Sequence, residues 1–272
     1  MLNNNNKIIE RTENDNRFWV SHSKMDVARK CMKLFDYKYI QKIKTDVENI
    51  YADFGSFVHE VAEHYKGEGK EKLIELFKNL VPSKFKIHES YKHKIPLALK
   101  NVHSYYANYL KKQIEFKNEL NLAFALEDDI IINGKIDILI KTKKGKWRVV
   151  DYKTKKTYKF YDPKDQLAMY MLLLHNIFDI PYEDIECEIV YVSLEREDKY
   201  GNIIPNEGYK NISKVYKVTY EDVKLLEREI RVLYKRIHKN IETNTWLSNP
   251  SWFNCTFCDY KDICEDSVAE TP

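Results

Sequence analysis

The stretch GKIDILIKTKKGKWRVVDYKTKK, residues 134–156, decides the fold. Its two apolar runs, on either side of a turn rich in Lys and Gly, predict two neighbouring antiparallel strands. Each strand carries an aspartate within its apolar run, Asp137 in the first and Asp151 in the second. Lys153 follows Asp151 by two residues, so both side chains point to the same face of the second strand. Carboxylates at such positions need a cation or a hydrogen-bonding partner.

The register of this hairpin follows from its turn, residues 142–146. If Lys141 pairs with Trp147, the pairing continues along both strands, with Leu139 opposite Val149, Asp137 opposite Asp151 and Lys135 opposite Lys153. Because side chains alternate along a strand, Asp137, Asp151 and Lys153 then share one face of the sheet. The other face is lined by Ile136, Ile138 and Ile140, with Val150 opposite Ile138.

Two carboxylates that face each other repel unless a proton or a cation lies between them. A divalent metal ion removes this repulsion, and oxygen ligands favour Mg²⁺ or Mn²⁺. Such an ion polarises a phosphodiester and helps to generate the attacking hydroxide, while Lys153 stabilises the developing negative charge. The hairpin alone leaves an alternative open, in which the two aspartates are polar residues of an exposed or edge strand with lysine partners.

The composition restricts the class of protein. The chain has 272 residues, enough for one large domain or two small ones, and its hydrophobic fraction of 43% is sufficient for a core. The net charge of +3 excludes a uniformly basic nucleic-acid wrapper, so any phosphate binding depends on local patches. The seven glycines form no P-loop or dinucleotide-binding cluster. We see neither an apolar run of membrane-spanning length nor a signal peptide, and we therefore expect an intracellular, cytoplasmic protein.

The remaining elements are predicted from hydrophobic periodicity and turn residues. Residues 1–16 are polar and are expected to be a disordered tail. Helices are expected at 21–40, 53–66, most of 70–120 with breaks at Pro82 and Pro96, 163–178 and 221–241, and strands at 130–141, 146–154, 186–196 and 214–220. This mixture of helices and strands predicts an α/β fold.

The five cysteines are expected to be thiols or metal ligands, because an intracellular compartment disfavours disulfides. Cys255, Cys258 and Cys264 supply three thiolates within ten residues. A closed metal site needs a fourth ligand, and sequence spacing leaves Cys31 and Cys187 as candidates. Four thiolates fit either zinc or a 4Fe–4S cluster, and their chemistry does not decide between the two.

The arrangement of Asp137, Asp151 and Lys153 resembles the D…D-x-K motif of the PD-(D/E)XK nuclease superfamily. Further motifs resemble its RecB-like branch: Gly55 and His59 in GSFVHE resemble the G-x(2–3)-H motif, Gln166 and Tyr170 in DQLAMY resemble the Q-x-x-x-Y motif, and Glu127 stands where relatives often carry an acidic residue. The segment around Cys31 resembles the N-terminal S-x-S…C…F-x-Y segment of that branch, which assigns Cys31 as the fourth thiolate. The one-plus-three spacing of the cysteines resembles that of the iron–sulfur nucleases of CRISPR adaptation.

The resemblance implies an α/β, restriction-endonuclease-like fold with a mixed central sheet flanked by helices. It implies a single nuclease domain over residues 17–272. Within it, Cys31 and residues 250–265 would form an iron–sulfur knob that joins the N- and C-terminal segments, with zinc as the alternative to the 4Fe–4S cluster. The site residues implied are His59, Asp137 and Asp151 as ligands of Mg²⁺ or Mn²⁺, Glu127 as a further candidate ligand, Lys153 as the residue that assists the nucleophile, and Gln166 and Tyr170 as residues that position the strand.

The function implied is metal-dependent hydrolysis of DNA phosphodiesters by an exonuclease. Its substrate would be single-stranded DNA or frayed DNA ends, with a 5′→3′ preference. Two alternatives stay open, namely an end-processing endonuclease that acts with integration or recombination partners, and a catalytically silent iron–sulfur scaffold that binds DNA. Helicase motifs are absent from the sequence, so any coupling to unwinding would need a partner. The expected partners are DNA and recombination, helicase or integrase-type proteins, and no membrane.

Overall fold

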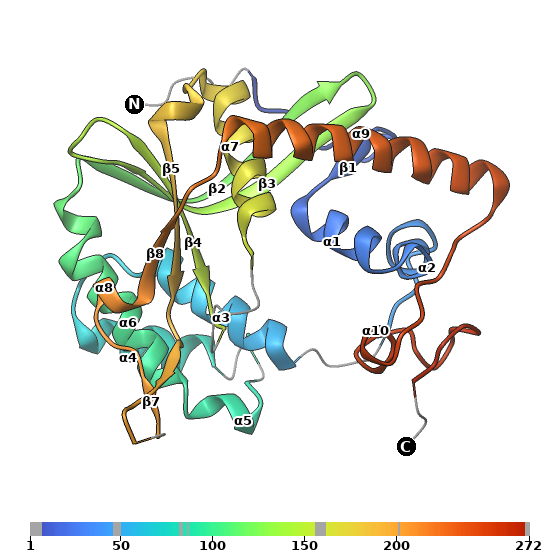
Figure 1. Cartoon of the computed structure of the whole chain (residues 1–272). Coiled ribbons are helices and arrows are strands. Elements are labelled where there is room, and N and C mark those ends of the chain that lie inside the picture. The colour runs from blue at the N-terminus through green and yellow to red at the C-terminus, as the bar shows by residue number, and fades with distance from the viewer. Residues whose placement is uncertain are drawn as a thin grey trace.

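The structure, a computed structural model, describes residues 7–45, 50–81, 84–85, 87–155, 162–200 and 202–269. It is a mixed α/β fold in which helices flank a mixed central sheet (Figure 1). The strands are β1 (Phe18–Val20), β2 (Glu115–Glu127), β3 (Ile130–Lys141), β4 (Trp147–Lys153), β5 (Ile185–Tyr191), β6 (Glu195–Glu197), β7 (Ile203–Pro205) and β8 (Ser213–Tyr216). The helices are α1 (His22–Lys30), α2 (Met32–Phe35), α3 (Ile50–His64), α4 (Lys70–Leu80), α5 (Glu89–Lys92), α6 (Ile95–Asn108), α7 (Lys164–Phe178), α8 (Tyr209–Ile212), α9 (Tyr220–Thr243) and α10 (Trp252–Thr256), with a π-helical turn at Asp36–Ile40 and 3₁₀ turns at Leu110–Lys112 and Tyr182–Asp184.

Strand β3 organises the central sheet because it pairs along both of its edges. On one edge, β2 runs antiparallel to it from end to end. On the other edge, β1 runs parallel to residues 130–132 and β4 runs antiparallel to residues 138–141. Beyond β4 follow β5, which is parallel to β4, and β8, which is antiparallel to β5. In the described part of the chain, residues 133–137 of β3 therefore have no strand on this second edge.

Two hydrophobic cores cover the two faces of the sheet. Val149 of β4 belongs to the core that contains α7 and α9, and the next residue, Val150, belongs to the core that contains α3, α4 and α6. This alternation is expected of a strand that is buried on both faces. Figure 1 shows α7 and α9 on one side of the sheet and α3, α4 and α6 on the other. None of the helices described is long and apolar enough to cross a membrane.

The alternation along β3 is interrupted at Asp137. Ile136 packs in the α7 core, whereas Ile138 and Ile140 pack in the α3 core. The prediction that these three isoleucines line one face is therefore wrong for Ile136. The physical reason lies in the neighbouring strand, where Glu119 stands across from Asp137 and has a φ of 54°. This left-handed conformation is unusual for a non-glycine residue and reverses the direction of the side chains that follow it.

The main difference from the predicted elements is the long strand β2. Residues 115–120 were expected to be helical, but they form the first half of β2, which pairs with β3 over residues 136–141. The long, apolar β3 offers an edge with unpaired backbone groups, and pairing with it outweighs local helix propensity. The predicted break at Pro96 is confirmed, because Pro96 lies in the first turn of α6. Pro82 lies outside the described residues.

Residues 7–16, which were expected to belong to a disordered tail, contact the sheet. The Ile9 N–H group donates a hydrogen bond to the Ala123 carbonyl oxygen at 3.0 Å. Ile8 packs against the α7 core, and Ile9 packs against a small cluster that includes Trp19. The two isoleucines thus give this polar segment an apolar contact with the sheet. Residues 1–6 lie outside the described residues.

The N-terminal helices and the C-terminal segment lie side by side, although more than 200 residues separate them (Figure 1). The Lys33 N–H group donates to the Leu247 carbonyl oxygen at 3.2 Å. The Tyr260 hydroxyl donates to the Ile43 carbonyl oxygen at 3.0 Å. The predicted contact between the two segments is therefore present in the structure.

Candidate active site

A cavity of about 590 Å³ opens where α3, β2, β3, β4 and α7 meet. It lies beside the stretch of β3 that has no strand on its second edge. The residues that line it include His59, Glu60 and Glu63 from α3, Glu119 from β2, Lys135 and Asp137 from β3, Asp151 and Lys153 from β4, and Gln166 and Tyr170 from α7. The structure thus brings six of the seven predicted residues of the nuclease site to one cavity, and Glu127 is the exception.

The predicted register of the hairpin is confirmed from Lys141 paired with Trp147 to Ile138 paired with Val150. The pairing ends there, so the predicted ladder pair of Asp137 and Asp151 is wrong, as is that of Lys135 and Lys153. The cause is a side chain: Asp137 Oδ2 accepts the N–H group of Tyr152 at 2.7 Å. The Asp137 carboxylate thereby takes the place of a backbone acceptor, and β4 beyond Val150 stays paired with β5.

A candidate metal site is formed by His59, Glu119 and Asp137. Each offers one ligand atom, and the three atoms all lie within 4.8 Å of one another. Asp137 Oδ1 lies 3.1 Å from Nδ1 of His59, and Glu119 forms an ion pair with Lys135. Two carboxylates and one imidazole are a donor set that fits Mg²⁺ or Mn²⁺. Burial lowers the pKa of His59, but the negative charges of Asp137 and Asp151 outweigh this effect and raise it above its ordinary value.

The Asp151 carboxylate is held by three side chains. Its Oδ1 accepts hydrogen bonds from Gln166 Nε2 at 2.7 Å and from the Tyr170 hydroxyl at 3.3 Å. Its Oδ2 lies 2.5 Å from the Lys153 ammonium. Burial raises the pKa of Asp151, the positive charge of Lys153 opposes this, and the negative charge of Asp137 adds to it. Gln166 and Tyr170, which were expected to position a DNA strand, contact Asp151 directly in this structure.

The sequence model of the PD-(D/E)XK nuclease superfamily matches residues 19–265. The chain belongs to this superfamily. The match covers every residue of the cavity described above and supports a restriction-endonuclease-like fold for this nuclease. No curated protein sequence matches the chain.

Two solved structures are similar to the nuclease over nearly its whole length. A candidate exonuclease from Eubacterium rectale has a TM-score of 0.55 at 14% sequence identity, with 97% of this chain and 96% of that chain covered. A protein designated SSO0001 has a TM-score of 0.45 at 13% identity, with 96% of this chain and 91% of that chain covered. At 14% identity the first likeness supports the fold alone.

The acidic residue that the sequence assigned to the nuclease site, Glu127, lies elsewhere. Its Oε1 accepts a hydrogen bond from Arg231 Nε at 2.5 Å, and about half of its side chain is exposed. Glu119 lies in the cavity instead, eight residues earlier in the same strand. Sequence reasoning missed Glu119 because it placed residues 115–120 in a helix. The alternating apolar residues of β2 are the signal that was available.

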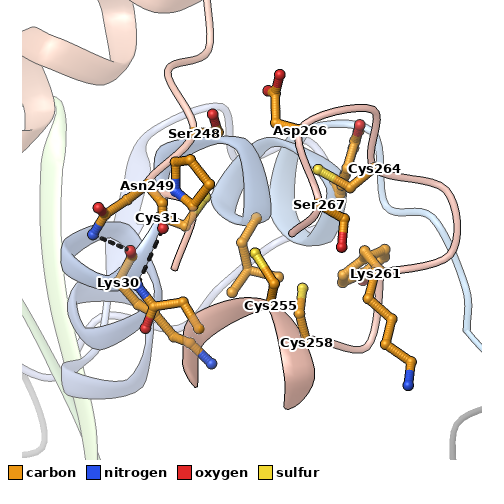
Figure 2. A pocket seen from close by; sticks show the side chains of 15 residues that line it. Lys30, Cys31, Ser248, Asn249, Cys255, Cys258, Lys261, Cys264, Asp266 and Ser267 are labelled. Carbon is orange, nitrogen blue, oxygen red and sulfur yellow. Dashed lines mark hydrogen bonds between the residues drawn. The ribbon is translucent and has the colours of Figure 1, made fainter. Parts of the chain in front are cut away.

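Four of the five cysteines of the nuclease line a second cavity, between α2 and the C-terminal segment. Figure 2 shows Cys31, Cys255, Cys258 and Cys264 around the same space. The remaining cysteine, Cys187, is buried in β5, and burial raises the pKa of its thiol to about 12. Of the two candidates for a fourth ligand, the structure therefore brings Cys31 and not Cys187 to the other three.

Proposed function

We propose that the chain is a Mg²⁺- or Mn²⁺-dependent DNA exonuclease that acts on single-stranded or frayed ends. The observation that carries this proposal is the meeting of His59, Glu119 and Asp137 with the Asp151–Lys153 pair in one cavity. Membership of the superfamily makes the protein a nuclease, and the name of the Eubacterium rectale structure favours exonuclease over endonuclease action. The 5′→3′ direction is proposed from the resemblance to RecB-like nucleases.

His59, Glu119 and Asp137 would hold the metal ion. A divalent ion held there would supply Lewis-acid chemistry, which polarises a phosphodiester and activates water. Lys153 lines the same cavity, where its ammonium would stabilise negative charge that develops on the phosphate. Asp151 fixes the position of that ammonium, and it is itself fixed by Gln166 and Tyr170.

A path for a DNA strand is supported by a further cavity of about 350 Å³. Lys135 lines both this cavity and the active-site cavity, so the two adjoin. The 350 Å³ cavity is lined by Arg11, which can contact phosphate, and by the amides of Asn121 and Asn133, which can make polar contacts to bases. Its volume suits about one nucleotide, which favours a single strand over a duplex beside the scissile phosphate.

Cleavage of labelled oligonucleotides tests the proposal. Single-stranded and duplex DNA, blocked at the 5′ or at the 3′ end, are incubated with Mg²⁺, Mn²⁺ or a chelator. We expect metal-dependent release of short products from single strands, and loss of that release when the 5′ end is blocked. Lys153→Ala should abolish cleavage, whereas Lys144→Ala, an exposed lysine of the β3–β4 turn, should not. Internal cuts in end-blocked DNA would favour the end-processing endonuclease, and intact DNA in every mixture would favour the silent scaffold.

We also propose that Cys31, Cys255, Cys258 and Cys264 hold a 4Fe–4S cluster. Four thiolates around one cavity fit either zinc or a 4Fe–4S cluster. The one-plus-three spacing of the cysteines, which resembles that of the iron–sulfur nucleases, favours the cluster. Its role would be to tie the N-terminal helices to the C-terminal segment.

Protein purified without air tests the cluster. A brown colour, a broad visible absorbance and four irons per chain are expected, and Cys31→Ser should lower the iron content and the melting temperature. Cys187→Ala is the matched control and should keep the iron. Stoichiometric zinc in colourless protein would contradict the cluster while leaving the nuclease proposal intact.

The sequence features that suggested partners and location lead to two further proposals. We propose that recombination, helicase or integrase-type proteins deliver DNA ends to this nuclease. We also propose a cytoplasmic location, because a reducing compartment keeps the four neighbouring cysteines of this cavity from forming disulfides. Co-purification with such a partner and fractionation of the source cells test these two proposals.

A further inference from the structure

An apolar groove lies between α4 and α6. It has a volume of about 650 Å³, and none of its described lining residues belongs to the active-site cavity. Its apolar lining consists of Leu73, Ile74, Phe77 and Val81 on the α4 side, Ile95, Pro96 and Leu99 on the α6 side, and Ile87 between them. Ile74 remains 51% exposed, so the two helices do not fill the space between them. An apolar surface of this extent marks an interaction site.

The rim of the groove is basic on both sides. Lys70 and Lys78 stand on the α4 side, and Lys92 and Lys100 stand on the side of α5 and α6. No acidic residue is among the described residues that line the groove. Lys92 and Lys100 also form ion pairs, with Glu89 and Glu207, so most of the unbalanced positive charge lies on the α4 side.

We propose that this groove binds an amphipathic helix of a partner protein, with an apolar stripe on its inner face and acidic residues beside that stripe. The lining residues of α4 recur at i, i+3, i+4, i+7 and i+8 from Lys70, which is one face of a helix. Two such faces side by side form the walls that receive a third helix. With 11 and 14 residues, α4 and α6 are about 17 and 21 Å long, so a partner helix of similar length fills the groove.

The lysine positions favour an acidic helix over a fatty acid. A fatty acid carries one carboxylate at one end, whereas the lysines stand on both sides and at both ends of the groove. Lys70 and Lys78 are eight residues apart, or about 12 Å along α4. Carboxylates two turns apart on a bound helix lie at nearly the same spacing, so each meets one ammonium. The groove also offers no free strand edge, because its walls are helices.

Fluorescence anisotropy with designed peptides and the full chain tests this proposal. The probe is a fluorescein-labelled, helix-stabilised peptide with leucines at i, i+4 and i+7 and glutamates on both sides of them. A second peptide has lysine in place of every glutamate. We expect the glutamate peptide to bind at least tenfold more tightly, and the difference to shrink as the salt concentration rises.

Three variants locate the binding site. Ile74→Glu should weaken binding of the glutamate peptide at least tenfold, and the double variant Lys70→Glu, Lys78→Glu should prefer the lysine peptide. Leu225→Glu is the matched control, because Leu225 of α9 is 64% exposed and distant in sequence from the groove. It should leave binding unchanged. Circular dichroism and DNA cleavage, which do not depend on the groove, establish that each variant is folded.

Five results would overturn the proposal, and the first four concern binding of the peptides. These are equal binding of the two peptides, no binding of either, an equal loss of binding in Leu225→Glu, and stoichiometric displacement of the peptide by laurate, which would make the groove a lipid site. Self-association of the chain that Ile74→Glu abolishes would also overturn it, since the occupant would then be a second copy.

Discussion

Replacing Glu119 by glutamine tests the metal site at the residue that the sequence did not reveal. The change keeps the size of the side chain and removes one of two carboxylates near His59. It also removes the carboxylate that forms an ion pair with the Lys135 ammonium. Both effects disfavour a divalent cation at this place. The matched control is Glu127→Gln, which removes the acid that the sequence proposed.

The expected size of the effect follows from electrostatics. A unit charge about 4 Å from a divalent ion contributes about 8 kcal/mol at an effective dielectric constant of about 20. A water or the new amide oxygen replaces most of this interaction. We expect a net loss of about 3 kcal/mol, which is roughly a 100-fold weaker affinity for Mn²⁺. Glu127 forms an exposed pair with Arg231, so its removal should cost less than about 1 kcal/mol of stability and no metal affinity.

Isothermal titration calorimetry with Mn²⁺ measures the affinity, and paramagnetic resonance of the free ion gives an independent value. Circular dichroism shows whether each variant is folded. An unchanged affinity in Glu119→Gln, or an equal loss in both variants, would refute the assignment of Glu119 to the metal site.

Three further predictions follow from the geometry. Asp137→Asn should weaken Mn²⁺ binding at least tenfold more than Asp151→Asn, because donors already occupy both oxygens of Asp151; calorimetry that gives equal losses would contradict this. Gly134→Ala would place its Cβ 2.8 Å from a buried leucine methyl of α7, and we expect it to lower the free energy of unfolding by about 1–3 kcal/mol. Gly55→Ala, in a helix interior with ordinary contacts, should raise the free energy of unfolding by about 0.5–1 kcal/mol. Urea unfolding measures both. Burial raises the pKa of Cys187 to about 12, so its thiolate fraction near pH 8 is about 1 in 10⁴ and grows as the pH rises. We therefore expect Cys187 of the folded protein to remain unmodified by iodoacetamide below about pH 10, which mass spectrometry measures.

Local patterns predicted the parts of the fold that depend on neighbouring residues. The pairing of Lys141 with Trp147 followed from a short turn, and the helix at 163–178 followed from an apolar run after Asp162 and Pro163. The structure has α7 at Lys164–Phe178, and Asp162 accepts the N–H group of Lys164. In both cases the decisive interactions connect residues that are close in the sequence, so the pattern contains them.

The positions that the sequence did not predict depend on distant partners. Strand β2 exists because β3 offers it an edge, and its first residues have no strong preference of their own. Glu119 enters the cavity because its backbone adopts a left-handed conformation opposite Asp137. Such a conformation costs about 1–2 kcal/mol in a non-glycine residue and is maintained only where the surrounding structure requires it. The pattern of side chains does not encode that backbone conformation.

The two aspartates that began as equivalent in the sequence have different surroundings in the structure. Asp137 uses one oxygen to hold the backbone of β4 and turns the other toward His59 and Glu119. Asp151 is 1% exposed. Its Oδ1 accepts a hydrogen bond from Gln166, and its Oδ2 contacts the Lys153 ammonium. Repulsion between two adjacent carboxylates would thus be relieved in two ways, by a metal ion in the proposed site at Asp137 and by the Lys153 ammonium at Asp151. The end of the hairpin ladder at Val150 separates the two, because a continued ladder would have kept both aspartates facing each other across the sheet.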